Sequence, residues 1–578
     1  MVVLIEFIAF LITLTIPGYL LVEKHFSGLE KAVLSVFLSL SITSFLYYFI
    51  ISFFSISKEI IYVYFLILLI FFVIIKKPKF NEIVFSIRNF KLKSTRIQKE
   101  NLPGLLLIFV LVLFLCLTAF FISVNKTVAS DDLAYHLPII IDIADDGKKT
   151  FFSETKNIYE VRSNQFPLLF ESFVASVKFF LGDFFYWFVS FFSLILSLFL
   201  IYFISKDTGH NQIFSSILYA FSPFVIIFSR YFYTDIFLSM FFLGSVFFVL
   251  NYVKTDNLFF LFVAGFLSGL MFLTKFTGGI FFAGLFLFLL YKRKFKESVF
   301  FGIIFVLVSL FFVVSHLTVP VEQVSTGDYG KFVSEAPLTQ IPLNVFKVTT
   351  ILFWYFSNYF YVIPILFFVG LFWVRPNEKD FSILFFISAV LFLGVTFVNQ
   401  VTPTSTGFPR YFLPIYSLIV TFAGFQLSKL VLLKNKYLAN FFWACFVLFI
   451  LFFSVSILSY FIIEPNTNPR NYYYIADKIG KNSDANIWFV NGGAILMLPN
   501  ATFYDYSWGA DFSGNPCQFL HKNRIDYVIY QDIEKTQTLN FLGKFGLELK
   551  EKLLLGECSE LFFESKDVFN ETSVFKIK

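Results

Sequence analysis

Residues 105–122, LLLIFVLVLFLCLTAFFI, form an apolar run of the length that crosses the hydrocarbon of a membrane. Soon after it the chain reads Ser130-Asp-Asp-Leu-Ala-Tyr-His-Leu-Pro138, a polar stretch with two adjacent carboxylates. Similar apolar runs lie at 184–204 and 441–463. Because 58% of the 578 residues are hydrophobic and only 15% are charged, the apolar surface exceeds what a soluble fold buries. The sequence predicts a polytopic α-helical membrane protein.

Two basic segments predict how the chain is oriented in the membrane. Residues 76–99 contain eight Lys or Arg and residues 291–296 contain four, so both are expected in the cytoplasm. The net charge of +6 therefore belongs to short loops, and no nucleic-acid partner is expected. Counting from these loops predicts about fourteen spans, near 2–22, 31–53, 60–75, 103–123, 184–205, 211–229, 235–253, 258–274, 278–291, 298–315, 351–374, 381–398, 411–433 and 438–463.

The first large outer loop, 124–165, and the segment after it are expected to carry juxtamembrane helices. Residues 166–182 are apolar, but counting them as a span would place 291–296 outside, so they are expected to form a juxtamembrane or re-entrant helix. Glu171 and Lys178 inside this segment fit an interfacial position. Another surface helix, with Leu137 and Ile140 on its apolar face, is expected to stop at Gly147.

The composition becomes that of a soluble protein after residue 464. Residues 487–490 and 527–530 resemble buried strands, and 472–479 resembles a helix, so a small C-terminal α/β domain is predicted. Cys517 and Cys558 fall in this tail and can bridge if the compartment is oxidising. The predicted domains are 1–102 with additional spans, a membrane core at 103–463, and an extracytoplasmic domain at 464–578.

Two carboxylate motifs lie where spans meet the outer surface. Asp131 and Asp132 can stay ionised there and accept a proton from a substrate, but a helix cap or a solvated loop end accounts for them equally well. Asp235 lies at the outer mouth of another span, where a capped helix start is the alternative. His136 either assists catalysis or forms a local hydrogen bond.

Two basic residues are expected on the same outer face. Lys275 lies between two apolar helices in Thr274-Lys-Phe-Thr-Gly-Gly279, which suits capture of a phosphate, although a snorkelling lysine is the simpler alternative. Arg410 begins a later span and can make bidentate phosphate contacts. No nucleotide-binding loop, metal-type Cys/His cluster or nucleophile elbow is present in the sequence.

The ordered motifs resemble the GT-C superfamily of membrane glycosyltransferases that use polyprenyl-phosphate sugars, above all the protein O-mannosyltransferase and aminoarabinose transferase branch. The resemblance covers roughly 103–463. It departs from the family pattern at Asn164-Gln-Phe-Pro167, where relatives often have a charged residue followed by two prolines, and in three additional N-terminal spans. The matching motifs are 131–138, 166–171 with 181–182, 230–235, 273–278 and 409–414.

The resemblance implies roles for individual residues. Asp131 or Asp132 acts on the acceptor, Asp235 joins them as a catalytic candidate or orients a partner, and Lys275, Arg410 and Tyr411 hold the donor phosphate. The remaining substrate-binding candidates are Tyr135, His136 and Arg230.

The implied reaction is transfer of a sugar from a polyprenyl-phosphate donor to an extracytoplasmic hydroxyl of a protein, lipid or glycan, in one inverting displacement at the plasma membrane. No cofactor is required; a divalent metal is possible but not indicated. Fixed cations stabilise the leaving phosphate and a carboxylate takes the proton. The alternatives are a transporter or flippase of lipid-linked sugars and a non-catalytic scaffold for surface glycan assembly. Membrane lipids are expected neighbours in each case.

Overall fold

The computed structural model describes residues 9–55, 57, 59–60, 63–68, 70, 102–125, 136–149, 163–164, 166–210, 212–315, 370, 374–398, 411–431, 478–479, 484–489, 502–504, 515–531, 543–566 and 571–578. Within these residues, five helices are long and apolar enough to cross a membrane: Gly28–Phe53, Phe185–Asp207, Thr234–Thr255, Phe295–Ser315 and Leu413–Leu430. The chain is therefore mostly helical and an integral membrane protein. The expected span at 438–463 lies outside the described residues, as do nearly all of 351–374 and half of 60–75, so the number fourteen stays a prediction.

The described elements follow the predicted order along the chain. The helices are α2 (Ile16–Val22), α3 (Gly28–Phe53), α6 (Leu102–Asn125), α7 (Leu137–Asp146), α9 (Leu169–Leu181), η3 (Phe185–Phe188), α10 (Val189–Asp207), α11 (Gln212–Ala220), α12 (Pro223–Ser229), α13 (Thr234–Thr255), α14 (Leu258–Thr274), α15 (Gly278–Tyr291), α16 (Phe295–Ser315), η5 (Pro376–Glu378), α21 (Lys379–Val398), α23 (Leu413–Val431), α26 (Pro516–Lys522) and α27 (Gly543–Leu555). The strands are β1 (Asn486–Phe489), β2 (Thr502–Tyr504), β3 (Tyr527–Gln531), β4 (Ser559–Lys566) and β5 (Glu571–Ile577).

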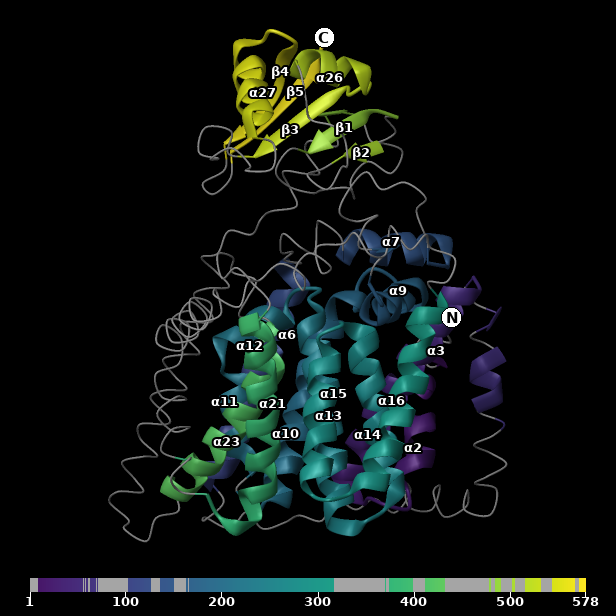
Figure 1. Ribbon diagram of the computed structural model, residues 1–578, viewed down its shortest axis with the longest axis vertical. Helices are drawn as coiled ribbons and strands as arrows, with labels where there is room; N and C mark the ends of the chain where they lie inside the picture. The colour runs from purple at the N-terminus through teal and green to yellow at the C-terminus, as the bar shows by residue number, and fades with distance from the viewer. Residues whose placement is uncertain are drawn as a thin grey trace.

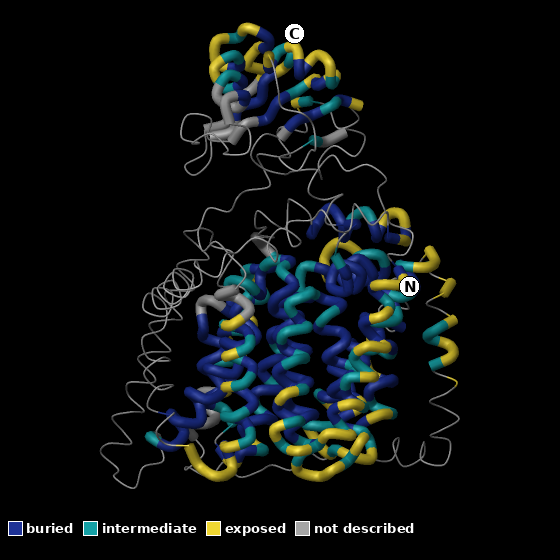
Figure 2. The backbone as a smooth tube through the Cα atoms, in the orientation of Figure 1, coloured by how far each residue is buried: buried dark blue, intermediate teal, exposed yellow. Residues whose placement is uncertain are grey.

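Helix α13 is the centre of the membrane bundle. Every residue from Thr234 to Leu250 is buried, because α13 packs against α10, α14, α15 and α23. A helix that is apolar all round buries its whole surface in protein or lipid, which accounts for the dark interior of the bundle in Figure 2. The packing of α13 therefore holds the residues at its two ends, including Asp235, in fixed positions.

The expected span at 211–229 is built from two short helices, α11 and α12, instead of one. The chain is extended at Ser222, with φ −72° and ψ 114°, and Pro223 is the first residue of α12. Proline disfavours the helical conformation at the residue before it and lacks the N–H that would continue the helix, so the break falls at Ser222.

Helices α7 and α9 lie across one end of the bundle (Figure 1). Helix α7 ends at Gly147, whose φ of 71° is the left-handed conformation that glycine favours, so the predicted stop is confirmed. Helix α9 begins after Leu168, which adopts φ 60° although it has a side chain. Glu171 in its first turn is 2% exposed, so its side chain is buried among protein residues.

The opposite end of the bundle carries paired charges. The α13–α14 and α15–α16 connections meet there through Lys294 and Asp256, whose Nζ and Oδ1 atoms are 2.5 Å apart. Lys292 pairs with Asp380 at the start of α21, 2.8 Å away. These connections include the basic segment 291–296, whereas Asp235 and Lys275 stand at the other ends of α13 and α14.

The C-terminal elements form a five-stranded mixed sheet in the order β2-β1-β3-β5-β4. Strand β1 pairs in parallel with β2 and β3, and β5 pairs antiparallel with β3 and β4. Trp488, Phe519 and Phe545 pack together beside the sheet. Figure 1 places this sheet beyond the end of the bundle where α7 and α9 lie. The expected helix at 472–479 lies almost entirely outside the described residues.

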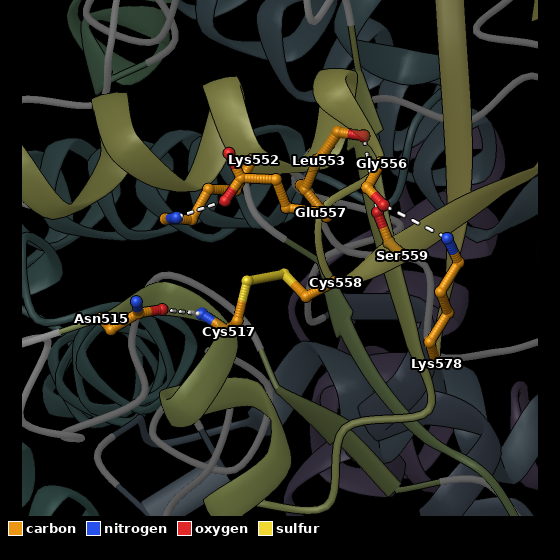
Figure 3. The surroundings of a disulfide bond; sticks show 9 residues. All are labelled: Asn515, Cys517, Lys552, Leu553, Gly556, Glu557, Cys558, Ser559 and Lys578. Carbon is orange, nitrogen blue, oxygen red and sulfur yellow. Dashed lines mark hydrogen bonds and ion pairs between the residues drawn. A yellow bond between two sulfur atoms is a disulfide. The ribbon is translucent and has the colours of Figure 1, made fainter.

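A disulfide joins Cys517 of α26 to Cys558, with their Cα atoms 5.5 Å apart (Figure 3). Cys558 comes directly before β4, so the bridge ties a helix to one edge of the sheet. The bridge that the sequence left open is present.

Candidate active site

Asp235 and Lys275 form an ion pair at the ends of α13 and α14 that lie away from the basic segment 291–296. The Lys275 Nζ donates to Asp235 Oδ1 at 2.8 Å, and Asp235 is 1% exposed whereas the lysine side chain is 16% exposed. The same Nζ lies 3.9 Å from the ring centroid of Tyr411, just before α23. Residues from three distant parts of the chain thus meet around the ammonium group of Lys275, whose side chain is partly exposed. Asp235 bridges two helices, which a simple helix cap does not do.

Gly278 makes the close turn that presents Lys275. A Cβ atom at Gly278 would lie 2.3 Å from the Met271 carbonyl carbon, so only glycine allows α15 to start this close to the backbone of α14. The Gly278 N–H donates to the Lys275 carbonyl at 2.8 Å, which closes the turn. A Cβ atom at Gly279 would meet only the Phe272 ring, at 3.6 Å. The glycine pair therefore works mainly through its first member.

Aromatic side chains connect the Asp235–Lys275 pair to His136 at the same end of the bundle. Tyr233, two residues before Asp235, lies with its ring centroid 6.3 Å from that of His136. The ring centroids of Tyr231 and Tyr233 are 5.7 Å apart. The guanidinium of Arg230 lies over the Tyr231 ring, 5.8 Å from its centroid. Arg230 is buried at 2% exposure. The structure thus brings the substrate-binding candidates His136 and Arg230 to the segment that leads into Asp235.

Two further ionisable residues belong to this mouth and were given no role by the sequence. Glu171 Oε1 lies 2.6 Å from His136 Nδ1, with both side chains buried. Lys149, just after α7, is 6% exposed, and its backbone N–H donates to the Ile51 carbonyl of α3 at 3.0 Å. Burial lowers the pKa of Lys149 to about 7, and the Glu171 carboxylate acts in the opposite direction. A glutamate within an apolar stretch was the available signal for Glu171; Lys149 had none.

Four other candidates, Asp131, Asp132, Tyr135 and Arg410, lie outside the described residues. In the part of the chain that the structure describes, no group of three or more His, Cys, Asp or Glu side chains is arranged to hold a metal. A cavity of about 490 Å³ between α2 and α3, lined by Tyr19, Lys31 and Ser35 among others, lies at the far end of α3 from Ile51 and does not reach this site.

Part of the chain matches a known protein family. Residues 170–318, which contain Glu171, Arg230, Asp235 and Lys275, match the family described as Dolichyl-phosphate-mannose-protein mannosyltransferase. No curated protein matches the chain in sequence.

Solved structures of ArnT from Cupriavidus metallidurans share the fold. The structure bound to undecaprenyl phosphate has a TM-score of 0.52 at 11% identity, and the apo structure 0.53 at 12%; each comparison covers 80% of this chain and 97% of ArnT. The arabinofuranosyltransferase AftD from Mycobacteria is more distant, with a TM-score of 0.42 at 11% identity over 82% of this chain and 40% of AftD. Residues 170–318 therefore resemble this mannosyltransferase family, and the chain shares the fold of ArnT.

Proposed function

We propose that this protein transfers a sugar from a polyprenyl-phosphate donor to a hydroxyl group on the extracytoplasmic side of the plasma membrane. The observation that carries the proposal is the Asp235–Lys275 pair beside Tyr411 at the outer mouth of the bundle. It supplies a cation, fixed in place, within the segment that matches the mannosyltransferase family. Undecaprenyl phosphate in the ArnT structure and dolichyl phosphate in the family description are both polyprenyl phosphates.

Lys275 is assigned to the donor phosphate. An ammonium group has three N–H donors and Asp235 Oδ1 accepts one of them, so other donors are available for a phosphate oxygen. As the bond between C1 of the sugar and the phosphate oxygen breaks, the leaving phosphate gains charge, and a fixed cation stabilises it most in the transition state. Arg410 and Tyr411 are the other phosphate-binding residues in this proposal. Asp235 holds Lys275 in position.

Asp131 is assigned to the acceptor, with Asp132 as the alternative. The acceptor oxygen forms a bond to C1 on the face opposite the leaving phosphate, and its proton passes to the carboxylate, so the configuration at C1 inverts. Tyr135, His136 and Arg230 complete the proposed substrate contacts. The protein, lipid or glycan nature of the acceptor is left to experiment.

The extracytoplasmic orientation rests on two further observations. The basic segment 291–296 lies at the opposite end of the bundle from Lys275, as the positive-inside rule requires. The Cys517–Cys558 disulfide is typical of an oxidising compartment.

Transfer from a purified polyprenyl-phosphate sugar to cell-envelope acceptors tests the proposal. We expect Asp131→Asn to keep donor binding and lower turnover by about 100- to 10,000-fold, because it removes the proton acceptor but preserves shape. Lys275→Ala should weaken donor binding as well as turnover. If both Asp131→Asn and Asp132→Asn keep nearly normal turnover, the acidic pair is only a helix cap. Movement of intact lipid-linked sugar across vesicles without transfer would favour the transporter, and neither activity would favour a scaffold.

A further inference from the structure

His136, Lys149 and Glu171 form a buried cluster where α7, α9 and α3 meet. His136 comes directly before α7, Lys149 follows it, and Glu171 lies in the first turn of α9. The His136 Nδ1 to Glu171 Oε1 distance is 2.6 Å, and the Lys149 Nζ donates to the Phe166 carbonyl at 3.4 Å. The cluster therefore holds both ends of α7, one through the imidazole and the other through the lysine.

Burying these groups has an energetic cost that apolar residues would avoid. Glu171 is 2% exposed, and its second oxygen, Oε2, has no hydrogen-bond partner among the described residues. Removing charged groups from water is unfavourable, and a buried ionic pair is often no more stable than well-packed apolar residues. The neighbours Phe170, Phe173 and Val174 are apolar and buried, so a leucine at position 171 would suit α9. The cluster is better explained by the single geometry that it imposes.

The backbone around the cluster is constrained in the same way. Leu168, before α9, has φ 60°, a left-handed conformation that is unfavourable for a residue with a side chain. On the other side, the Ile51 carbonyl at the end of α3 accepts the Lys149 N–H, and the rings of Tyr47 and Phe180 stack with centroids 6.2 Å apart. The N-terminal helix α3 thus forms part of the support for α7 and α9.

The cluster of His136, Lys149 and Glu171 is next to the acidic motif in sequence and close to the Asp235–Lys275 pair in space. In sequence, His136 follows directly after the acidic motif at 131–135. In space, its ring lies against Phe170 and against Tyr233, which leads into Asp235. Glu171 binds His136. It therefore also fixes the position of the backbone directly after the acidic motif, relative to the Asp235–Lys275 pair.

We propose that Glu171 is a positioning residue: by binding His136, it holds α7 on α9 and α3 and so fixes the chain directly after the acidic motif relative to the Asp235–Lys275 pair. This inference rests on the proposed glycosyl transfer. It also assigns a task to the additional N-terminal helix α3, which completes the outer face of the catalytic bundle.

The test combines hydrogen exchange with kinetics on the full-length protein. The variants are Glu171→Gln, which keeps the shape, and the matched control Asp183→Asn, which removes the exposed Lys178–Asp183 pair next to the same helix. Amide exchange over residues 137–146 should accelerate in Glu171→Gln and stay at the wild-type rate in Asp183→Asn, with α13 unchanged in both. With a polyprenyl-phosphate sugar, Glu171→Gln should lower kcat by about 10- to 100-fold, the scale of a misplacement of about 1 Å, and leave the donor KM within about twofold.

A double-mutant cycle adds a readout that a general loss of stability would not reproduce. If His136 and Glu171 act as a unit, His136→Asn combined with Glu171→Gln should lower kcat no further than the more severe single variant. Glu171→Asp should recover part of the lost turnover, because it restores the charge at a shorter reach.

The outcomes separate this inference from the proposed function. Equal exchange over 137–146 in Glu171→Gln and Asp183→Asn would overturn the inference whether or not the protein transfers sugar. Faster exchange with unchanged kcat in an active enzyme would overturn the positioning role. A wild-type protein that transfers no sugar contradicts the proposed function, and the exchange experiment then still decides whether Glu171 holds α7.

Discussion

Asp235 and Lys275 serve both stability and the proposed donor binding, and a pair of variants can separate these contributions. Lys275→Met leaves the 1%-exposed carboxylate of Asp235 without its charge partner. Loss of one partner from a buried pair costs about 3–5 kcal/mol, whereas replacing both is often nearly neutral. We therefore expect Lys275→Met to lower the unfolding temperature in detergent, and Asp235→Asn combined with Lys275→Met to recover most of it. Sugar transfer should stay low in both.

The control for this prediction is a pair with the same chemistry at the other end of the bundle. Lys292→Met removes the Lys292–Asp380 pair, which is more exposed and is therefore worth less than about 1 kcal/mol. It should leave donor binding unchanged. Recovery of transfer in the double variant would show that Lys275 does not contact the donor phosphate.

Lys149 gives the folded protein a characteristic pH dependence. Burial lowers its pKa to about 7 from the ordinary value of 10.5, so between these two pH values the unfolded chain binds a proton that the folded chain does not. Stability from this residue should therefore rise as the pH increases from about 7 to about 10.5, and be lowest below about 7, where the buried amine must be charged. Thermal unfolding in detergent from pH 6 to 10 should show this rise, and Lys149→Met should remove it. Lys148 is the exposed neighbour of Lys149, and Lys148→Met should leave this rise unchanged. If the unfolding temperature of Lys149→Met rises with pH as in the wild type, another group causes the effect.

The sequence located part of the site but not its contacts. The parity of the spans placed Asp235 and Lys275 on one face, yet the 2.8 Å pairing depends on how α13 and α14 are rotated, which periodicity cannot fix in helices that are apolar all round. Glu171 was expected in a juxtamembrane helix because of the parity of the spans, and the sequence did not show its partner. Its partner, His136, is 35 residues away. The carboxylates expected to be catalytic, Asp131 and Asp132, stay predictions.

The α14–α15 hairpin depends on Gly278 for its close approach. A Cβ atom at this position would lie 2.3 Å from the Met271 carbonyl carbon, so Gly278→Ala should push the helices apart, cost about 1–3 kcal/mol and displace Lys275. We expect lower thermal stability and weaker donor binding. Gly279→Ala is the matched control, because its new Cβ would make an ordinary contact of 3.6 Å with Phe272. Equal losses in the two variants would show that helix propensity and not the close approach governs the turn.

At the scale of elements, local signals predicted most boundaries well. Both α14 and α15 begin and end where the apolar pattern does, and Gly147 ends α7 as expected. The break at Ser222 could be missed because a proline within an apolar run is compatible with either a kinked or a divided helix. The packing of α3 against α9 and α16 was beyond the sequence, which offered no chemistry for the additional N-terminal spans.

At the scale of the whole molecule, the disulfide supports the proposed placement of the C-terminal sheet in an oxidising compartment. Closing a loop with a sequence separation of 41 stabilises a folded domain by about 4 kcal/mol in the chain-entropy treatment. Peptide mapping without reduction should find Cys517 linked to Cys558, while Cys116, which is free, should react with an alkylating agent once the protein is denatured. Two free thiols at 517 and 558 in protein isolated from cells would contradict the extracytoplasmic placement of the tail.

Orientation of the whole bundle follows from its two chemically distinct ends, and labelling in intact cells can test it. Helix α13 has 22 residues, about 33 Å of helix, with Asp235, the partner of Lys275, in its first turn, and it ends at the residue before Asp256, the partner of Lys294. This length crosses a hydrocarbon core of about 30 Å, so we expect the two ends on opposite sides of the membrane. In a cysteine-free background, Asp183→Cys is the outer probe because its side chain is 77% exposed next to α9, and Lys296→Cys is the inner probe beyond α15. We expect a membrane-impermeant maleimide to label position 183 in intact cells and position 296 only after lysis, because positive charges are retained in the cytoplasm. Label at both positions from outside would refute the parity that places the proposed site, the disulfide and the acceptor in one compartment. Label at 296 alone would invert the chain and move the proposed transfer to the cytoplasmic face.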